Sequence, residues 1–179
     1  MVEIEVKIKI KDIEETITKI KKLGAHLEKK RRFEENILYD FPSRSLSQGK
    51  QALRVRKTDR KTFLTFKGSP QRSRKFKVRD EYETEVKNEK QLKKILKSIG
   101  LIPSFRYQKY RAVFKHKKLK LCLDETSIGN FLELEGEREQ IVRMAVALGY
   151  SKKEFIKKDY VQLFQEMRKG LQTGDPEVP

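Results

Sequence analysis

The chain has 179 residues, of which 43 are basic and 26 are acidic, and its formal net charge is +17. This length supports one domain with a substantial core. The positive charge indicates an anionic partner: a nucleotide, a polyphosphate, a nucleic acid or an anionic membrane surface. A single cysteine, Cys122, excludes an internal disulfide, and we find neither a secretory signal nor an apolar run that could span a bilayer. We therefore expect a cytoplasmic protein that does not associate with membranes.

The first strand is predicted from the alternation of charged and β-branched apolar side chains between Val2 and Ile10. Because successive side chains of a strand point to opposite faces, Glu3, Glu5 and Lys7 share one face. An ordinary half-exposed strand would show the same pattern. Its recurrence along the chain is what favours a functional interpretation.

Helices are predicted where apolar residues recur at helical spacing. The first follows Asp12, a suitable N-cap, and ends near Gly24. The later helices are expected at 89–99, at 137–148 and around 160–164. After the first helix, a strand at 33–41 leads into the Ser-, Gly- and Gln-rich segment 42–50. This composition is typical of a mobile loop, and such loops often fold over a bound ligand.

The remaining strands are sorted by the sign of their charges. Two basic pairs share a face, Arg54 with Arg56 in 53–56 and Lys109 with Arg111 in 105–115, and the basic Lys67 shares a face with Thr65 in 62–68. Acidic side chains dominate the others: Glu81, Glu83 and Glu85 in 80–86, Asp124 at the end of 119–125, and Glu133 with Glu135 in 131–135. Solvent-facing strands ordinarily mix Thr, Ser, Lys and Glu. This sorting therefore indicates a function.

About eight strands with one apolar and one charged face predict an α+β fold: a closed eight-stranded antiparallel β-barrel with its helices packed outside. The charged faces would then line a central tunnel wide enough for one small ligand. Burying so many ions without water would cost several kcal/mol each, so we expect water, metal ions and a polyanion to complete the site. Crowded cations should also repel one another in an empty tunnel, so that removing Arg54, Arg56 or Lys67 would raise the thermal stability.

The charged side chains suit a linear triphosphate bound together with divalent metal ions. Arginine grips phosphate oxygens bidentately and lysine adds a point charge, so the candidate triphosphate-binding residues are Arg54, Arg56, Lys67, Lys109 and Arg111. The candidate catalytic residues are Lys7 and Lys109. Carboxylates are hard oxygen ligands for Mg²⁺ or Mn²⁺, and the candidate metal ligands are Glu3, Glu5, Asp124, Glu133 and Glu135. No Ser-His-Asp set is available in the sequence.

These residues form an ordered set of motifs. Along the chain they are Glu3-x-Glu5-x-Lys7, Leu53-Arg54-x-Arg56, Phe66-Lys67-Gly68, Lys109-x-Arg111, Asp124 and Phe131-x-Glu133-x-Glu135. In this order they resemble the CYTH superfamily, the triphosphate tunnel metalloenzymes, from Glu3 to about Phe164. The segments 127–135 and 160–163 are most similar to the class IV adenylyl cyclase (CyaB-like) branch, although Asp159 stands where that branch commonly has a serine.

The resemblance implies an eight-stranded antiparallel tunnel, dependence on Mg²⁺ or Mn²⁺, triphosphate substrates and, in many members, a homodimer. We expect a single CYTH domain at 1–169 and a disordered tail at 170–179. The same tunnel serves two reactions: conversion of ATP to 3′,5′-cyclic AMP and pyrophosphate by an adenylyl cyclase, and hydrolysis of tripolyphosphate or thiamine triphosphate. A third interpretation, a basic nucleic-acid-binding protein, agrees with the net charge. The interleaved acidic strands disfavour it because they would repel a phosphate backbone.

Overall fold

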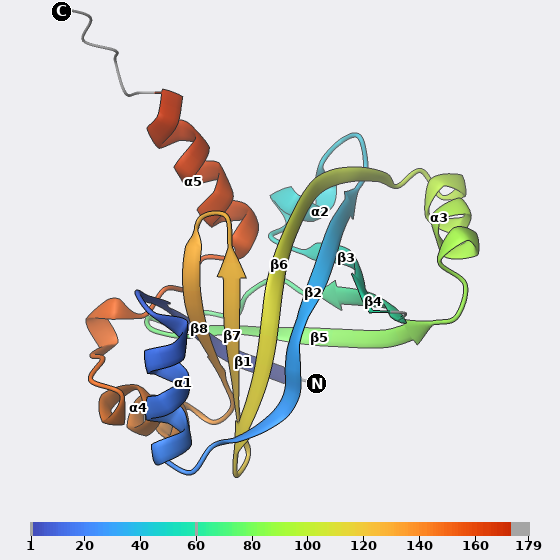
Figure 1. The fold of residues 1–179 in the computed structure, drawn as a ribbon. Helices are drawn as coiled ribbons and strands as arrows, with labels where there is room; N and C mark the ends of the chain where they lie inside the picture. Colours follow the sequence, from blue (N-terminus) through green and yellow to red (C-terminus); the bar gives the residue numbers. More distant parts are fainter. Residues whose placement is uncertain (1, 60, 173–179) are drawn as a thin grey trace, which may run out of the picture.

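The structure, a computed structural model, describes residues 2–59 and 61–172. Its strands form one closed barrel in the order β1-β5-β4-β3-β2-β6-β7-β8 (Figure 1). All neighbouring strands are antiparallel, and β1 closes the barrel by pairing with both β5 and β8. The strands are β1 (Val2–Ile10), β2 (His26–Asp40), β3 (Ala52–Thr58), β4 (Lys61–Lys67), β5 (Lys77–Val86), β6 (Ile102–His116), β7 (Leu119–Thr126) and β8 (Gly129–Glu135). The predicted closed eight-stranded antiparallel β-barrel is confirmed.

The helices lie outside the barrel (Figure 1). They are α1 (Ile13–Lys22), α2 (Ser45–Gln48), α3 (Glu89–Ser98), α4 (Arg138–Ala147) and α5 (Tyr160–Gln172), with a short 3₁₀ turn at Lys152–Glu154. The first helix begins as its sequence predicts: the Asp12 carboxylate accepts a hydrogen bond from the Glu15 N–H at 2.9 Å. This bond satisfies one of the N–H groups that have no partner inside the helix.

The short helix α2 lies in the segment 42–50, for which the sequence predicts a loop. Asp40, at the end of β2, organises this segment by accepting hydrogen bonds from the backbone N–H groups of Phe41, Leu46 and Ser47. A helix that is held by hydrogen bonds from its backbone to one carboxylate needs no apolar residues at helical spacing, and that spacing is what a sequence pattern detects. The sequence pattern therefore could not reveal the helix.

Three apolar clusters hold the helices against the barrel. The largest joins Ile8 and Leu134 on the outward face of the sheet to Ile20 of α1 and Ile141 of α4. A second joins β2 and β3 to α3, and a third, which contains Tyr160, places α5 against the barrel. Each large apolar side chain that is fully buried contributes about 1.5–3 kcal/mol. In the first two clusters the apolar faces point outward to the helices, so the charged faces point into the barrel. The third cluster lies at the cavity itself, since Tyr107 and Tyr160 are among its lining residues.

Three strands start well before the residues that their alternation predicts. The strands β2 and β6 each span 15 residues and pair with each other, with register shifts near Leu27 and Lys29. The first part of β2 is exposed and charged, so no apolar face marks it. The strand β5 begins at Lys77, in a segment that the sequence predicts as a basic connection. This earlier start brings Lys77 and Arg79 into the barrel.

The helix α5 continues to Gln172, so the chain is still helical after residue 170, where the disordered tail was predicted to begin. The rest of that predicted tail, 173–179, lies outside the described residues. The domain boundary at residue 169 stays a prediction. Within the described ranges, no helix is both long and apolar enough to cross a membrane.

Candidate active site

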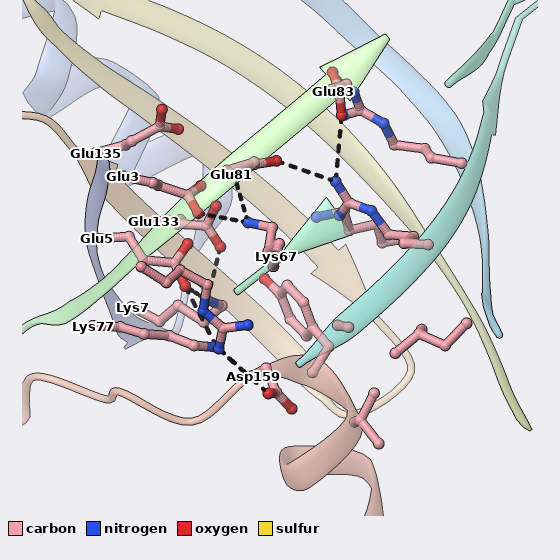
Figure 2. A pocket seen from close by; sticks show the side chains of 18 of the residues that line it. Glu3, Glu5, Lys7, Lys67, Lys77, Glu81, Glu83, Glu133, Glu135 and Asp159 are labelled. Carbon is pink, nitrogen blue, oxygen red and sulfur yellow. Dashed lines mark hydrogen bonds and ion pairs between the residues drawn. The ribbon is translucent and has the colours of Figure 1, made fainter. Parts of the chain in front are cut away.

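The barrel encloses a cavity that is lined by every strand and by the first turn of α5. Its lining contains nine lysine and arginine side chains and seven carboxylates. The free space is about 120 Å³, whereas sites for drug-sized ligands span about 300–1,000 Å³. The space is small because the lining cations and carboxylates pair with one another (Figure 2). A polyanion that entered this cavity would therefore have to displace some of these internal ion pairs.

Lys7 lies between two carboxylates on a buried wall formed by β1 and β8. Its Nζ is 3.2 Å from Glu5 Oε1 and 3.0 Å from Glu133 Oε2, since the register places Lys7 opposite Glu133. Burial alone would lower the pKa of Lys7, but the charges of Glu133 and Glu5 raise it well above its ordinary value. Lys7 is therefore a cation at neutral pH, suited to holding phosphate oxygens and not to removing a proton.

Asp124 is the centre of a second buried network. Arg111 donates to both of its oxygens, from Nε at 2.6 Å and from Nη2 at 2.5 Å, and the Lys109 Nζ and the Tyr160 hydroxyl donate at 3.0 and 2.5 Å. Burial would raise the pKa of Asp124, but the charges of Arg111 and Lys109 hold it below its ordinary value. The sequence predicts a metal ligand here. The structure instead places both carboxylate oxygens on protein donors, and Asp124 is not among the residues that line the cavity.

The opposite wall, formed by β3, β4 and β5, carries other predicted triphosphate-binding residues. Lys67 Nζ lies 2.7 Å from Glu3 Oε2 and 3.0 Å from Glu81 Oε2 (Figure 2). Arg56 Nη2 donates to Glu83 Oε1 at 2.8 Å. Glu81 lies on the strand next to that of Lys67, whereas Glu3 and Glu83 each reach across one intervening strand to their cation.

The predicted gain in stability on removing Arg54, Arg56 or Lys67 stays a prediction: burial and repulsion by the charge of Arg54 lower the pKa of Arg56, whereas carboxylate partners oppose this repulsion. Arg54 also has a carboxylate partner, since its Nη2 lies 3.5 Å from Glu83 Oε2. The strand order places β5 between β4 and β1, and the acidic half of β5, from Glu81 to Glu85, pairs with β4. Strands that carry one sign in the sequence become neighbours of strands that carry the other. The carboxylates that line the barrel therefore offset much of the positive charge of its lysine and arginine side chains.

The chain can be placed among known proteins at this point. Its sequence matches the CYTH domain over residues 1–159. The chain belongs to the CYTH family. A protein of Methanocaldococcus jannaschii, whose name assigns it provisionally to the adenylate cyclases, is 32% identical over 176 residues, which cover 91% of this chain and 98% of that protein. The predicted resemblance to the CYTH superfamily is confirmed.

Solved structures share the CYTH fold of this chain. A provisionally assigned adenylate cyclase from Vibrio parahaemolyticus has a TM-score of 0.81 and 20% identity, covering 92% of this chain and 98% of its own. A protein from Hippeastrum, described as a provisional adenylyl cyclase with a dominant triphosphatase activity, has a TM-score of 0.68 and 20% identity, covering 92% of this chain and 96% of its own. At this identity both likenesses concern the fold.

Three carboxylates, those of Glu3, Glu5 and Glu81, lie where β1 meets β5 in the CYTH barrel. Burial, the charge of Glu5 and a hydrogen bond with Glu81 raise the pKa of Glu3 to about 8, against the opposing charge of Lys67. A divalent cation relieves such crowding of carboxylates, and hard oxygens are the ligands that Mg²⁺ and Mn²⁺ prefer. Within residues 2–59 and 61–172, no three His, Cys, Asp or Glu side chains converge closely enough to hold a metal ion. The donor chemistry of Glu3, Glu5 and Glu81 fits a divalent cation, and binding would require Lys67 to move.

The other two predicted metal ligands line the CYTH cavity beside Glu5. Glu135 lies opposite Glu5 in the register, and its Oε2 is 2.6 Å from Lys120 Nζ. Glu133 is shared between Lys7 and Arg111, the latter at 3.1 Å. The structure therefore brings both carboxylates to the site, each with a cationic partner.

The CYTH tunnel also contains residues that the sequence did not predict. Lys77 Nζ lies 3.6 Å from Glu5 Oε1 and 3.4 Å from Asp159 Oδ2, and burial lowers the pKa of Lys77 to about 8. Lys77 and Arg79 continue the two-residue period of the acidic strand, so a longer count of that alternation could have found them. Asp159 carries no local signal. It reaches the tunnel only because the segment before α5 returns to the barrel.

Proposed function

We propose that this CYTH protein is a metal-dependent enzyme that binds a triphosphate in its tunnel and converts ATP to 3′,5′-cyclic AMP and pyrophosphate. The observation that carries the proposal is the convergence on one site of cations that each lie beside a carboxylate: Lys7, Arg54, Arg56, Lys67, Lys109 and Arg111. Phosphate oxygens can replace the more exposed of those carboxylates and can add to the contacts of the cations whose carboxylates stay in place. The name of the Methanocaldococcus jannaschii relative supports cyclisation as the reaction.

Binding would begin on the wall formed by β3, β4 and β5. Arg54 and Arg56 would leave Glu83 and hold phosphate oxygens bidentately. Lys67 would turn from Glu3 toward the phosphates, which frees Glu3 for a cation. A divalent cation held by Glu3, Glu5 and Glu81, with Glu133 and Glu135 as further proposed ligands, would neutralise phosphate charge when bound. Substrate and metal would therefore bind cooperatively.

Lys7 and Lys109 are the proposed catalytic residues. In cyclisation the ribose 3′-oxygen attacks the α-phosphorus in line, the bond to the β-phosphate oxygen breaks, and pyrophosphate leaves with the electron pair. Fixed ammonium groups stabilise the charge that develops on the leaving group. Because Lys7 keeps its proton at neutral pH, the proton of the 3′-hydroxyl must go to solvent or to a tunnel carboxylate.

A second candidate reaction is hydrolysis of tripolyphosphate or thiamine triphosphate. The free space of about 120 Å³ suits a bare triphosphate better than a nucleotide. The Hippeastrum protein, which shares the fold, is described as having a dominant triphosphatase activity. Water would then attack a terminal phosphorus, with the same side chains holding the substrate. A surface-bound nucleic acid could not use them, because they point into the barrel.

The deciding experiment is incubation of the protein with ATP and, separately, with tripolyphosphate, each with Mg²⁺ or Mn²⁺, followed by identification of the products. Cyclic AMP with an equal amount of pyrophosphate is the expected result. Orthophosphate from tripolyphosphate without any cyclic AMP would replace the cyclase by the triphosphatase. Absence of product and of triphosphate binding would overturn both. Arg56→Ala is the test variant, and Arg106→Ala, with an exposed guanidinium near Glu35, is its matched control.

A further inference from the structure

The last helix joins the tunnel at an aromatic cluster. Tyr160 is the first residue of α5, directly after the segment 1–159 that matches the CYTH domain. It is buried, and its ring centroid lies 5.6 Å from that of Tyr107 and 5.7 Å from that of Phe131. In Figure 1, α5 extends away from the barrel, and the apolar contacts of α5 with the strands come from its first turns. The aromatic packing therefore fixes where the helix begins.

Tyr160 contacts both proposed catalytic lysines. Lys109 Nζ lies 4.7 Å and Lys7 Nζ lies 5.3 Å from the centroid of its ring, within the range at which an ammonium group is attracted to an aromatic face. The Tyr160 hydroxyl donates to Asp124 Oδ2 at 2.5 Å, and the same oxygen accepts from Lys109 Nζ at 3.0 Å. One side chain therefore contacts two cations and orients the carboxylate that holds one of them.

The segment before Tyr160 is anchored to the same site. Ile156 forms a backbone bridge with Lys7, with N···O distances of 3.0 and 2.8 Å. Asp159 accepts a hydrogen bond from the Gln162 N–H at 3.0 Å, and its other oxygen lies 3.4 Å from Lys77 Nζ. Contacts with tunnel residues on two strands, β1 and β5, thus determine the position of Tyr160.

We propose that Tyr160 is a positioning residue, which holds Lys7 and Lys109 at their phosphate-binding positions through its ring and, by way of Asp124, through its hydroxyl. The part of this proposal that concerns phosphate rests on the proposed function. A merely structural Tyr160 would do no more than fill the aromatic cluster. Phe164, one turn later, belongs to that cluster too, with its ring centroid 5.9 Å from that of Tyr107. Phe164 is therefore the matched control.

The test compares Tyr160→Leu, Tyr160→Phe and Phe164→Leu with the wild type. Calorimetry gives the Kd for tripolyphosphate with Mg²⁺, and steady-state kinetics give KM and kcat. Loss of two cation–π contacts should weaken binding by about tenfold in Tyr160→Leu, and loss of the hydroxyl alone by about threefold in Tyr160→Phe. KM should rise more than kcat falls. Phe164→Leu should lower the melting temperature but leave the Kd within about twofold of the wild type.

A second measurement, the chemical shifts of the Lys7 and Lys109 side-chain amines by NMR without ligand, does not depend on function. These chemical shifts should change in Tyr160→Leu, which lacks the aromatic ring, and should be the same as in the wild type in Phe164→Leu. Unchanged amine shifts together with an unchanged Kd in Tyr160→Leu would overturn the proposal. If Tyr160→Leu does not fold, a wild-type Kd in Tyr160→Phe would refute the hydroxyl's role. If the wild type binds no triphosphate, the proposed function fails, while the amine shifts still decide whether Tyr160 positions the lysines.

Discussion

Two walls of the tunnel differ in how tightly their charges are enclosed. On the closed wall, which we define as Asp124, Lys109 and Arg111, the side chains are 0%, 2% and 9% exposed, and their contacts measure 2.5–3.0 Å. On the open wall, defined as Arg54, Arg56 and Lys67 with Glu81 and Glu83, the cations are 12–17% and the carboxylates 19–30% exposed, and their contacts measure 2.8–3.9 Å. The first wall is nearly dry, whereas solvent reaches the second.

This difference suggests how one site can be both stable and able to exchange partners. Removing one partner of a buried ion pair costs about 3–5 kcal/mol, because the other charge is left without compensation. An ion pair near solvent contributes only about 0–1 kcal/mol, since water replaces the lost partner. The closed wall can therefore maintain the geometry of the tunnel. The open wall can release its carboxylates to phosphate oxygens.

The largest expected effect is on stability, from Asp124→Asn. We expect a loss of about 3–5 kcal/mol in urea unfolding at pH 7, because Arg111 and Lys109 lose their shared anion. The control is Glu125→Gln in the same strand, whose partner Arg31 is half exposed, with an expected loss below about 1 kcal/mol. Equal losses in the two variants would contradict the distinction between the walls.

The stability that Asp124→Asn loses should also depend on pH. The pKa of Asp124 is lowered in the folded protein, so its contribution is present above the pKa of an unfolded aspartate, about 3.9. It is lost as the pH falls through the lower folded value. The difference in unfolding free energy between wild type and Asp124→Asn should therefore shrink below about pH 4. A difference in unfolding free energy that grows in acid would contradict a lowered pKa of Asp124 in the folded protein.

The next effect is on turnover, from Glu3→Gln or Glu5→Gln. Either variant should lose activity on the order of 10²–10³-fold while it stays folded by circular dichroism, because a neutral amide is a poor ligand for a divalent cation. Activity is measured across a titration of Mg²⁺ and of Mn²⁺. Glu85→Gln, an exposed carboxylate of β5 paired with Lys61, should behave as wild type. Normal metal-dependent activity in folded Glu3→Gln would remove Glu3 from the metal site.

A smaller effect is expected from Arg54→Ala on the open wall. Its affinity for tripolyphosphate should fall about 10–100-fold, the value of one charged hydrogen-bonding group. Its stability should change by less than about 1 kcal/mol. Calorimetry with and without Mg²⁺ measures the affinity, and Mg²⁺ should strengthen it in the wild type. Identical affinities of Arg54→Ala and wild type would place the phosphate site elsewhere.

The smallest effect is expected at Asn36, which lies opposite Arg56 on β3 and Tyr107 on β6. Asn36 is fully buried, and neither polar atom of its amide hydrogen-bonds to a described residue. Asn36→Leu should therefore leave the stability unchanged or raise it by about 1 kcal/mol. Thermal unfolding measures it, with Asn36→Ala as the cavity-forming control. A loss above about 2 kcal/mol in Asn36→Leu would show that this amide has a partner in solution.

The sequence by itself determined which faces of the strands carry the chemistry. A strand has a period of two, so the alternation in β1 assigns Glu3, Glu5 and Lys7 to one face without any knowledge of the neighbours. The same holds for Arg54 with Arg56 and for the later basic and acidic pairs. Helical spacing and caps located α1, α3 and α4 in the same local way. These features depend on residues that are close together in the chain.

Only the tertiary structure decided which charges meet. Glu3 reaches Lys67, and Lys7 reaches Glu133, because β1 lies between β5 and β8 in the closed barrel. Asp124 and Tyr160 likewise meet only because α5 packs against the barrel. Strand order, register and closure are set by contacts between residues far apart in the chain. No spacing within a single strand contains that information, so the sequence predicted many members of the site but neither Lys77, Arg79 and Asp159 nor the pairing of the charges.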